Sequence, residues 1–568
     1  MAKFYLTNDL GLFDKVNNLV EESEFKPSFS YAGNGIYALA THKLREDNVN
    51  AYKEGEDFLI ATGTLIFKGG NDLKEVFDNY SDPISNQDDT LGGFCIAKFA
   101  HGLLRVSCDV MSGYDVFYYH NNNEFFISNS LYDMAVILKE RLTVNSLNIV
   151  EYVAQNNIIN NETFFNEIFR LFDDFIEIDI KKNTFSTVGF TLQYPMCSES
   201  SDDCAKKMAE RLKKYAASVV GLYGRPDMCM TGGLDARTVL ASFISTGVLP
   251  NLHYGVGNSY ITGTNTTDLD IDRLLKERYG MSLREGNWQT PEPFDRDWDY
   301  YITKYGFDSL FYGTSGNVIK FYESMPERIT ATGQVGEMYR TLEWADSWNK
   351  PFFTLDEFLD SYYLRNDILL MTEHVEGYKE HIRRKLKHIC DKYSLDENRI
   401  AIEDYFYFLL EYRKRADMTL MNFLNKISYS CYLLYDRVCL QAARLSCEDL
   451  RGSSFMLKVI NQIEPSLLDI PVYSHGKLRT LDKDNLKLMP LQLSINDRVK
   501  AFLPQSLKNH LKRARYYFRK TTALDNCVQE RMQTISMIPG LSFKGNTDKR
   551  AEINYMTIER ILDILSIR

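Results

Sequence analysis

The sequence predicts two unlike parts: a sheet-rich α+β domain over residues 1–195, and an α/β domain over 196–568 with a doubly wound parallel sheet and a helical C-terminal part. Residues 1–195 contain many short apolar runs bounded by Gly, Asn and Asp. From residue 196 strand-like runs alternate with helical patterns, and from about residue 355 helical spacing predominates. A chain of 568 residues is also too long for one hydrophobic core.

Composition limits the class of protein. With 44% hydrophobic and 25% charged residues, the chain is typical of a folded globular protein. Its net charge of −11 argues against general nucleic-acid binding. The 10 cysteines show no Cys-x-x-Cys spacing, which argues against a zinc ribbon and favours reduced thiols. The N-terminus lacks a signal-peptide pattern and no run of 18 apolar residues occurs, so we expect a cytoplasmic protein.

The first domain is predicted to be built mainly of strands. Runs rich in Phe, Tyr, Ile and Val indicate strands, and Asn121–Asn123 between two of them indicates a hairpin turn. Helical spacing appears in Leu131–Leu138 and Leu147–Ala154. The strand-like runs lie at 35–40, 58–67, 93–99, 103–108, 116–119 and 125–128.

The second domain begins with an amphipathic helix over Ser201–Leu222, whose apolar residues form one stripe. Strands are then predicted at 228–230, 249–257 and 328–333, with helices from Thr238 to Phe243 and from Asp270 to Gly280 between them. This alternation favours a parallel doubly wound sheet, in which ligands bind beyond the C-terminal ends of the strands. Further helices are predicted over 355–370, 374–393, 402–425 and 436–445.

One segment of the second domain carries a distinct chemical signal. An apolar run ends at Gly232-Gly233, Asp235 follows, and a helical pattern comes next. Strand, glycine turn and helix N-terminus together favour an anion site, because unpaired backbone N–H groups and the helix dipole both attract negative charge. An acid there is understandable if it holds a metal ion that a phosphate shares. The segment is neither the Gly-x-x-x-x-Gly-Lys-Ser/Thr loop nor the Gly-x-Gly-x-x-Gly fingerprint.

Thr231–Arg237 reads Thr-Gly-Gly-Leu-Asp-Ala-Arg and resembles the PP-loop of ATP pyrophosphatases, in the form that occurs in the asparagine synthetase family. Two further segments resemble that family in the same order, Tyr254–Gly257 and Thr332–Met338. The alternative interpretation is a set of ordinary strand–turn–helix corners with unrelated glycine turns. On this resemblance the chain is identified as a divergent member of the family, and the second domain is expected to have the PP-loop, adenine nucleotide alpha hydrolase-like fold.

The resemblance implies ATP and Mg²⁺ as cofactors. Asp235 and Glu337 are then expected to hold Mg²⁺, and Val256 is expected to lie against the adenine. Gln334 stands where the family has an acid, and Lys477 or Lys458 would supply the lysine that acts on the acyl-adenylate. The full set of expected nucleotide-binding positions is Thr231, Gly232, Gly233, Leu234, Asp235, Ala236, Arg237, Val256, Thr332 and Gly333.

Residues 1–195 resemble the glutaminase domain that precedes the synthetase domain in this family, which has the Ntn-hydrolase fold of class II glutamine amidotransferases. The resemblance rests on Gly92–Phe99, Asp109–Tyr119 and Phe126–Leu131. The family's catalytic cysteine is replaced by Ala2, and its oxyanion Asn-Gly pair by Thr62-Gly63. We therefore expect this domain not to hydrolyse glutamine.

Two departures alter the expected synthetase chemistry. Ala236 replaces a serine whose hydroxyl would contact phosphate, which removes one hydrogen bond and leaves the backbone donors. Gln334 cannot act as a base, so another group must take the proton of the attacking amine.

The resemblance therefore implies an ATP-dependent ligase that adenylates a carboxylate, releases AMP and pyrophosphate, and forms an amide without its own glutaminase activity. The expected partners are a small-molecule, sugar or peptide carboxylate and an ammonia or amine co-substrate, with a possible homodimer and no nucleic acid. A catalytically decayed nucleotide-binding or scaffold protein is the main alternative, and a separate subunit that supplies ammonia is another. The basic segment 507–520 is predicted to be a packed terminal helix, or alternatively a surface for an anionic or lipid-linked substrate.

Overall fold

The fold is given by a computed structural model. It describes residues 3–254, 266–284, 298–307, 316–339, 350–364, 368, 371–416, 418–442, 444, 453–474, 477–483, 485–488, 538, 541 and 549–567. The basic segment 507–520 and Val256 lie outside these residues.

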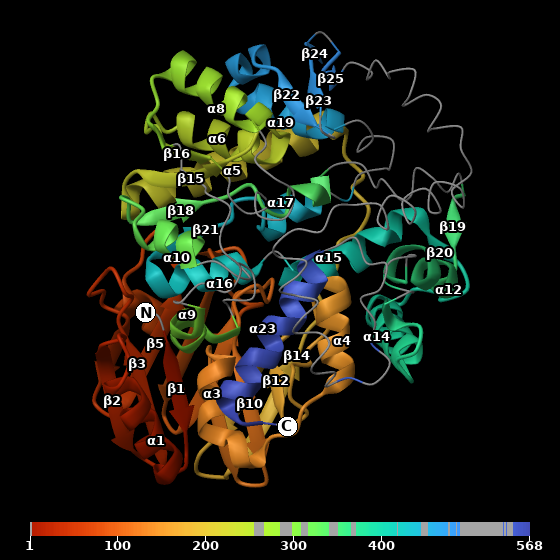
Figure 1. Cartoon of the computed structure of the whole chain (residues 1–568). Coiled ribbons are helices and arrows are strands. Elements are labelled where there is room, and N and C mark those ends of the chain that lie inside the picture. The colour runs from red at the N-terminus through yellow and green to blue at the C-terminus, as the bar shows by residue number, and fades with distance from the viewer. Residues whose placement is uncertain are drawn as a thin grey trace.

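Two antiparallel six-stranded sheets form the N-terminal part, at the bottom of Figure 1. The first has the order β12 (Ile168–Arg170), β10 (Phe117–Asn121), β11 (Glu124–Ser128), β1 (Phe4–Thr7), β3 (Ile36–Thr41), β2 (Pro27–Gly33). The second has the order β14 (Thr184–Gly189), β13 (Asp174–Asp179), β9 (Leu103–Cys108), β8 (Phe94–Ala100), β5 (Asp57–Gly63), β4 (Ala51–Glu54). The predicted hairpin at Asn121–Asn123 joins β10 to β11.

The two sheets pack face to face between outer helices. Aromatic rings connect them, with Tyr31 of β2 against Phe58 of β5 and Tyr118 of β10 against Phe185 of β14. Helices α1 (Leu10–Glu21) and α3 (Leu131–Leu138) contact the first sheet, and α2 (Leu73–Asn79) contacts β4 and β5 of the second. A separate apolar cluster under α2 explains why strand β5, next to the edge strand β4, is buried on both faces.

A five-stranded parallel sheet forms the centre of the C-terminal part and confirms the predicted parallel sheet. Its strand order is β17 (Leu283–Arg284), β16 (Asn251–Tyr254), β15 (Pro226–Met230), β18 (Ile329–Ala331), β21 (Tyr429–Cys431). The chain leaves the central β15 for β16 and β17 on one side and then returns to β18 on the other. The order of strands therefore reverses between β15 and β18, where ligands bind in open α/β sheets.

Helices cover both faces of this sheet (Figure 1). Residues of β15 alternate between the faces, as strand geometry requires: Met228 and Met230 join the main core, and Cys229 packs against a separate aromatic cluster. That second cluster is formed by α9 (Trp298–Tyr305), α10 (Gly316–Glu323) and α16 (Met418–Ile427). Helices α5 (Ser201–Tyr223), α6 (Leu234–Ile244) and α19 (Ser454–Ile463) contact one another, and α8 (Thr266–Tyr279) contacts β16 and β17.

Some predicted helices are shorter or divided. The pattern over 402–425 becomes a 3₁₀ turn at Ile402–Asp404, helix α15 (Tyr405–Ala416) and helix α16. The pattern over 374–393 gives α14 (Tyr378–Tyr393), which begins after Gly377 at φ +75°. In the described part of 355–370, α12 (Leu355–Phe358) continues as a π-helix over Leu359–Tyr363.

The remaining described elements are short pieces and the C-terminal helix. They are α4 (Ser146–Gln155), α17 (Arg437–Ala442), 3₁₀ segments at Lys139–Arg141, Gly336–Tyr339 and Pro465–Asp469, and the strand pairs β6 (Ile66–Phe67) with β7 (Thr90–Leu91), β19 (Phe352–Phe353) with β20 (Ile400–Ala401), β22 (Val472–Ser474) with β23 (Lys477–Arg479), and β24 (Leu481–Asp482) with β25 (Lys487–Leu488). Helix α23 (Lys549–Leu565) lies beside α4, so this helix packs on the N-terminal part (Figure 1).

None of the described helices is long and apolar enough to span a membrane.

A buried cluster of charges joins the two parts of the chain. Asp173, next to β13, accepts from Lys414 of α15 at 2.7 and 2.6 Å and also contacts Lys392 of α14. Glu411 bonds Lys392 at 2.9 Å and Lys414 at 3.2 Å. Burial alone would raise the pKa of Asp173, but Lys414 and Lys392 outweigh it and lower that pKa to about 2.

We predict that Asp173→Asn destabilises the chain by about 3–5 kcal/mol at pH 7, because it leaves two buried ammonium groups with too little negative charge. A carboxyl with a lowered pKa stabilises the fold above its unfolded pKa of about 3.9, so this contribution disappears as pH falls from about 4 towards 2. Urea denaturation followed by near-UV circular dichroism measures both effects.

Asp78→Asn, in the exposed Lys74–Asp78 pair, is the matched control and should leave the urea midpoint nearly unchanged. Equal midpoints for Asp173→Asn and Asp78→Asn would contradict the prediction that the loss of Asp173 leaves uncompensated buried charge.

Candidate active site

Two loops meet where the strand order of the parallel sheet reverses. Thr231, Gly232 and Gly233 follow β15, and residues 332–335 follow the adjacent β18. A Cβ added at Gly333 would lie 2.4 Å from the backbone N of Ala236, which shows that the two main chains touch. The structure therefore brings together the two segments that the sequence marks as phosphate- and metal-binding.

The first of these loops ends in the exposed N-terminus of a helix. Helix α6 begins at Leu234, and its N-cap Gly233 (φ −74°, ψ 172°) supplies no side-chain hydrogen bond. Leu234 and Ala236 are buried, Asp235 is half-buried in the first turn, and Thr231 is exposed. First-turn amides without a side-chain cap are hydrogen-bond donors suited to an anion. The helix starts four residues earlier than the predicted Thr238, which places Asp235 on its first turn.

An acid that sequence reasoning missed already contacts this loop. Asp268, in the first turn of α8, accepts a hydrogen bond of 2.7 Å from the backbone N–H of Gly232. The predicted helix began at Asp270, so Asp268 was left out of the site. The polar run Thr266-Thr267-Asp268 before an apolar periodic pattern is a helix-start signal that could have located it.

Asp272 lies one helical turn beyond Asp268. It is 0% exposed, and neither carboxyl oxygen has a hydrogen-bond partner among the described residues. Burial, together with the nearby Asp268, raises the pKa of Asp272 to about 8, and Arg237 offsets the two only in part. The carboxyl of Asp272 is therefore held largely neutral at pH 7.

The guanidinium of Arg237 is fully buried and donates to three backbone carbonyls. Its distances are 3.3 Å to Leu467, 2.6 Å to Ile470 and 2.7 Å to Pro471. Burial lowers its pKa to about 10. These bonds tie the segment 467–471 to α6. The side chain of Arg237 thus has a structural partner, and its predicted nucleotide contact stays a prediction.

The second loop is strained and contains a polar side chain. The buried Thr332 accepts from the backbone N–H of Gln334 at 3.3 Å. The side-chain oxygen of Gln334 is buried without a hydrogen-bond partner among the described residues. Val335 has a φ of +69°, which is costly for a β-branched residue. Strain of this kind is common at functional sites.

Glu337, one of the two predicted metal ligands, forms an ion pair of 2.5 Å with Arg413 of α15. In the described part of the chain, no group of three or more His, Cys, Asp or Glu side chains is arranged to hold a metal ion. A site built from Asp235 and Glu337 would thus provide two protein carboxylates, and their metal role stays a prediction.

The two lysines predicted to act on the acyl-adenylate lie in different structural elements. Lys458 of α19 pairs with Asp202 at 2.8 Å and with Ser201 at 3.1 Å, which ties it to the start of α5. Lys477 lies in β23, where its backbone pairs with Ser474. Its predicted catalytic role stays a prediction.

The N-terminal part has a buried polar network at the position where the sequence predicts the oxyanion residues. Thr62 lies 2.6 Å from the Tyr114 hydroxyl, which accepts from Asn129 at 2.9 Å. Asn129 in turn accepts from the backbone N–H of Phe4 at 3.0 Å. Cys95 lies in β8, where burial raises the pKa of its thiol, and Ala2 is outside the described residues. Thr62 therefore joins β5 to β1 through side chains rather than presenting an amide to a substrate.

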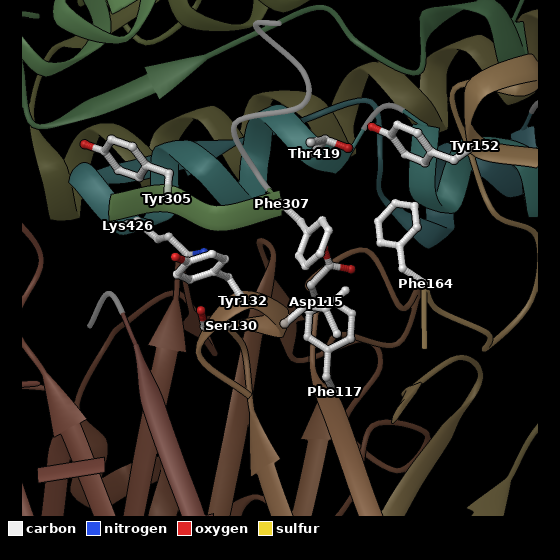
Figure 2. Close-up of a pocket in the computed structure, with 11 residues that line it drawn as sticks. Asp115, Phe117, Ser130, Tyr132, Tyr152, Phe164, Tyr305, Phe307, Thr419 and Lys426 are labelled. Carbon is white, nitrogen blue, oxygen red and sulfur yellow. The ribbon is translucent and has the colours of Figure 1, made fainter. Parts of the chain in front are cut away.

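A small cavity lies between the two parts of the chain (Figure 2). It has a volume of about 40 Å³, enough for about three water molecules. Nucleotide-sized ligands need clefts of roughly 300 Å³ or more, so this cavity is no alternative nucleotide site. It is lined by Asp115, Phe117, Ser130, Leu131, Tyr132, Tyr152, Phe164, Tyr305, Phe307, Thr419 and Lys426.

Comparison with known proteins adds little. No protein-family model matches the chain, and no curated protein matches it. Among solved structures, one similar chain is the glutamine phosphoribosylpyrophosphate amidotransferase from B. subtilis, complexed with ADP and GMP. It is 7% identical, with 50% of this chain and 90% of that chain covered and a TM-score of 0.22. This likeness is too slight to carry an argument about fold or function.

We predict that Gly333→Ala destabilises the chain by about 1–3 kcal/mol, because its Cβ would strike the backbone of α6, which cannot move without disturbing the helix. Gly221→Ala is the matched control, since a Cβ there meets nothing within 4 Å in helix α5. Alanine in a helix should stabilise by up to about 1 kcal/mol. Urea midpoints measure both, and a Gly333→Ala variant as stable as the native chain would contradict the contact.

We predict that Asp272→Asn stabilises the chain at pH 8 and not at pH 4. A raised carboxyl pKa means that ionisation of Asp272 costs stability as pH rises from its unfolded pKa of about 3.9 towards about 8. The neutral amide avoids that cost. Asp270→Asn, exposed on the same helix, is the control, and a gain for Asp272→Asn that is independent of pH would refute the buried neutral carboxyl.

Proposed function

We propose that the chain is an ATP-dependent ligase that adenylates a carboxylate, releases pyrophosphate and AMP, and forms an amide. The observation that carries this proposal is the contact of the two loops at the reversal point of the parallel sheet, where Gly333 touches the backbone of Ala236. This is where α/β sheets bind nucleotides. The Thr-Gly-Gly-Leu-Asp motif and an uncapped helix N-terminus lie at the same point.

The donors of this site suit a phosphate chain. The first-turn amides of α6 would bind pyrophosphate oxygens, and Asp235 and Glu337 would hold Mg²⁺. ATP with Mg²⁺ would supply the adenylyl group: a carboxylate oxygen bonds to the α-phosphorus, pyrophosphate leaves, and the resulting acyl-adenylate is a good acyl donor. Arg413 brings a positive charge to Glu337 and is therefore a further group that could contact phosphate after that ion pair opens.

Binding at this site has to displace one internal contact. The N–H of Gly232 donates to Asp268, so an oxygen of the nucleotide would compete with the Asp268 carboxylate for that donor. The Asp268 carboxylate would then accept from another donor or share the metal ion. Nucleotide binding at this loop would therefore have to break the hydrogen bond between Gly232 and Asp268.

Gln334 has a limited chemical role in the proposed reaction. A glutamine side chain cannot remove a proton, so it orients substrates by hydrogen bonding, and the amine must lose its proton to another group or to solvent. The side-chain oxygen of Gln334, which has no hydrogen-bond partner in the described part of the chain, is a suitable acceptor for an N–H of the incoming amine.

The amine is proposed not to come from glutamine bound to this chain. Position 2 carries alanine rather than cysteine, and Thr62 is bonded to Tyr114. Free ammonia or the amino group of a second substrate would therefore attack the acyl-adenylate of a small-molecule, sugar or peptide carboxylate. A homodimer is compatible with this proposal.

A second candidate is a nucleotide-binding or scaffold protein whose synthetase site has decayed. The observation in its favour is that two key groups are already engaged, Gly232 with Asp268 and Glu337 with Arg413. Ala236 also lacks the hydroxyl of the family motif. Under this proposal ATP–Mg²⁺ binds, as calorimetry would detect, but no carboxylate is activated.

We predict that, with ATP, Mg²⁺ and a panel of carboxylates and amines, the chain forms AMP and pyrophosphate in equal amounts. Asp235→Asn should lower this rate at least about a hundredfold, because it removes one of the two carboxylates that would hold Mg²⁺ on the leaving pyrophosphate. Asp270→Asn, exposed on α8, should not change the rate. Formation of ADP and phosphate would exclude adenylation, and ATP binding without turnover would favour the scaffold.

A further inference from the structure

Two cysteines lie unusually close in the segment that joins the two parts of the chain. The sulfur of Cys197 is 2.6 Å from the sulfur of Cys204. A disulfide bond is about 2.05 Å long, so a movement of about half an ångström would close it. We propose that Cys197 and Cys204 form a reversible disulfide, which ties the connecting segment to the first turn of α5.

Both cysteines are held in place by separate contacts. Cys204 lies in the first turn of α5, where its backbone N–H donates to Ser200 at 3.0 Å. Cys197 donates its backbone N–H to Arg444 at 2.9 Å, and the guanidinium of Arg444 returns a bond of 2.9 Å to Tyr194. Gln441 donates to Pro195 at 2.8 Å. The sulfurs are thus brought together by two anchored segments, which favours ring closure over bonding to other thiols.

The two thiols differ in access. Cys204 is 2% exposed, and its burial raises its pKa to about 12, whereas Cys197 is only partly buried. An incoming disulfide reaches the partly exposed sulfur of Cys197 more readily than the buried sulfur of Cys204, so Cys197 reacts first.

The reaction balances with a small-molecule disulfide such as oxidised glutathione. Cys197 loses its proton to solvent and attacks one glutathione sulfur; a mixed disulfide forms and one glutathione leaves as thiolate. Cys204 then loses its proton and attacks the Cys197 sulfur, and the second glutathione leaves. Two cysteine thiols are oxidised, and one oxidised glutathione is reduced to two glutathione molecules.

Another cysteine pair in the chain provides an internal control. Cys95 and Cys108 are direct partners across β8 and β9, yet each is 1% exposed within the sheet core. Burial raises the pKa of both thiols. We expect them to stay reduced, because an oxidant reaches neither sulfur.

The disulfide would restrain the segment that connects the two parts of the chain. Helix α5 contacts three helices, α6, α17 and α19. Of these, α6 carries Asp235. A covalent bond from the first turn of α5 to Cys197 would fix the connecting segment against this helical layer. Cys197 would then be held by a covalent bond to Cys204 as well as by its backbone hydrogen bond to Arg444.

The test uses the full chain, incubated without denaturant in oxidised or in reduced glutathione and then alkylated in denaturant. Tryptic cleavage releases residues 183–206, which contain both cysteines, and cleavage after Glu199 divides that peptide between them. In the oxidised sample we expect the two halves to remain joined through Cys197 and Cys204, with both alkylation sites lost together. In the reduced sample both cysteines should be alkylated.

Single variants separate the two roles. In Cys204→Ser, Cys197 should carry glutathione as a stable mixed disulfide, whereas in Cys197→Ser the buried Cys204 should stay unmodified. Full alkylation of Cys197 and Cys204 after incubation in oxidised glutathione would overturn the proposal. So would a disulfide from either cysteine to a third one, or oxidation of Cys95 and Cys108 in preference to this pair.

Discussion

The contact between the main chains at Gly333 and Ala236 is the constraint on which the candidate site depends. Adjacent parallel strands end at the same edge, but their loops can approach this closely only where a residue lacks a Cβ. The contact fixes the N-terminus of α6, and with it Asp235, against the loop that carries Gln334 and Glu337. A bulkier residue at 333 would separate the two halves of the site.

A second constraint is the buried charge cluster that joins the two parts of the chain. Asp173, Lys392, Glu411 and Lys414 form a buried set of opposite charges in which each charged group has a partner of opposite sign. Such a set is costly to desolvate and contributes little net stability, but removing one member leaves an uncompensated charge. It therefore acts against alternative arrangements of the sheet-rich part relative to α14 and α15.

The sequence was informative wherever a pattern is local. Helix α5 has nearly the predicted limits, the parallel sheet forms, and both glycine-containing loops lie at strand ends, because periodicity and glycine turns are read within a few residues. Contacts between distant segments were not predictable. Asp268 binds Gly232 across 36 positions, and Arg237 is held by carbonyls 230–234 positions away. Both depend on how elements pack, which no single motif encodes.

The central claim is that the loops after β15 and β18 form one nucleotide site. Hydrogen–deuterium exchange of the backbone amides at 231–237 and 332–338, with and without ATP–Mg²⁺, tests it most directly. The account predicts slower exchange in both segments together, with the same dependence on nucleotide concentration, and no such change in the outer hairpin β13–β14. Protection of one loop alone, or protection confined to other parts of the chain, would contradict it.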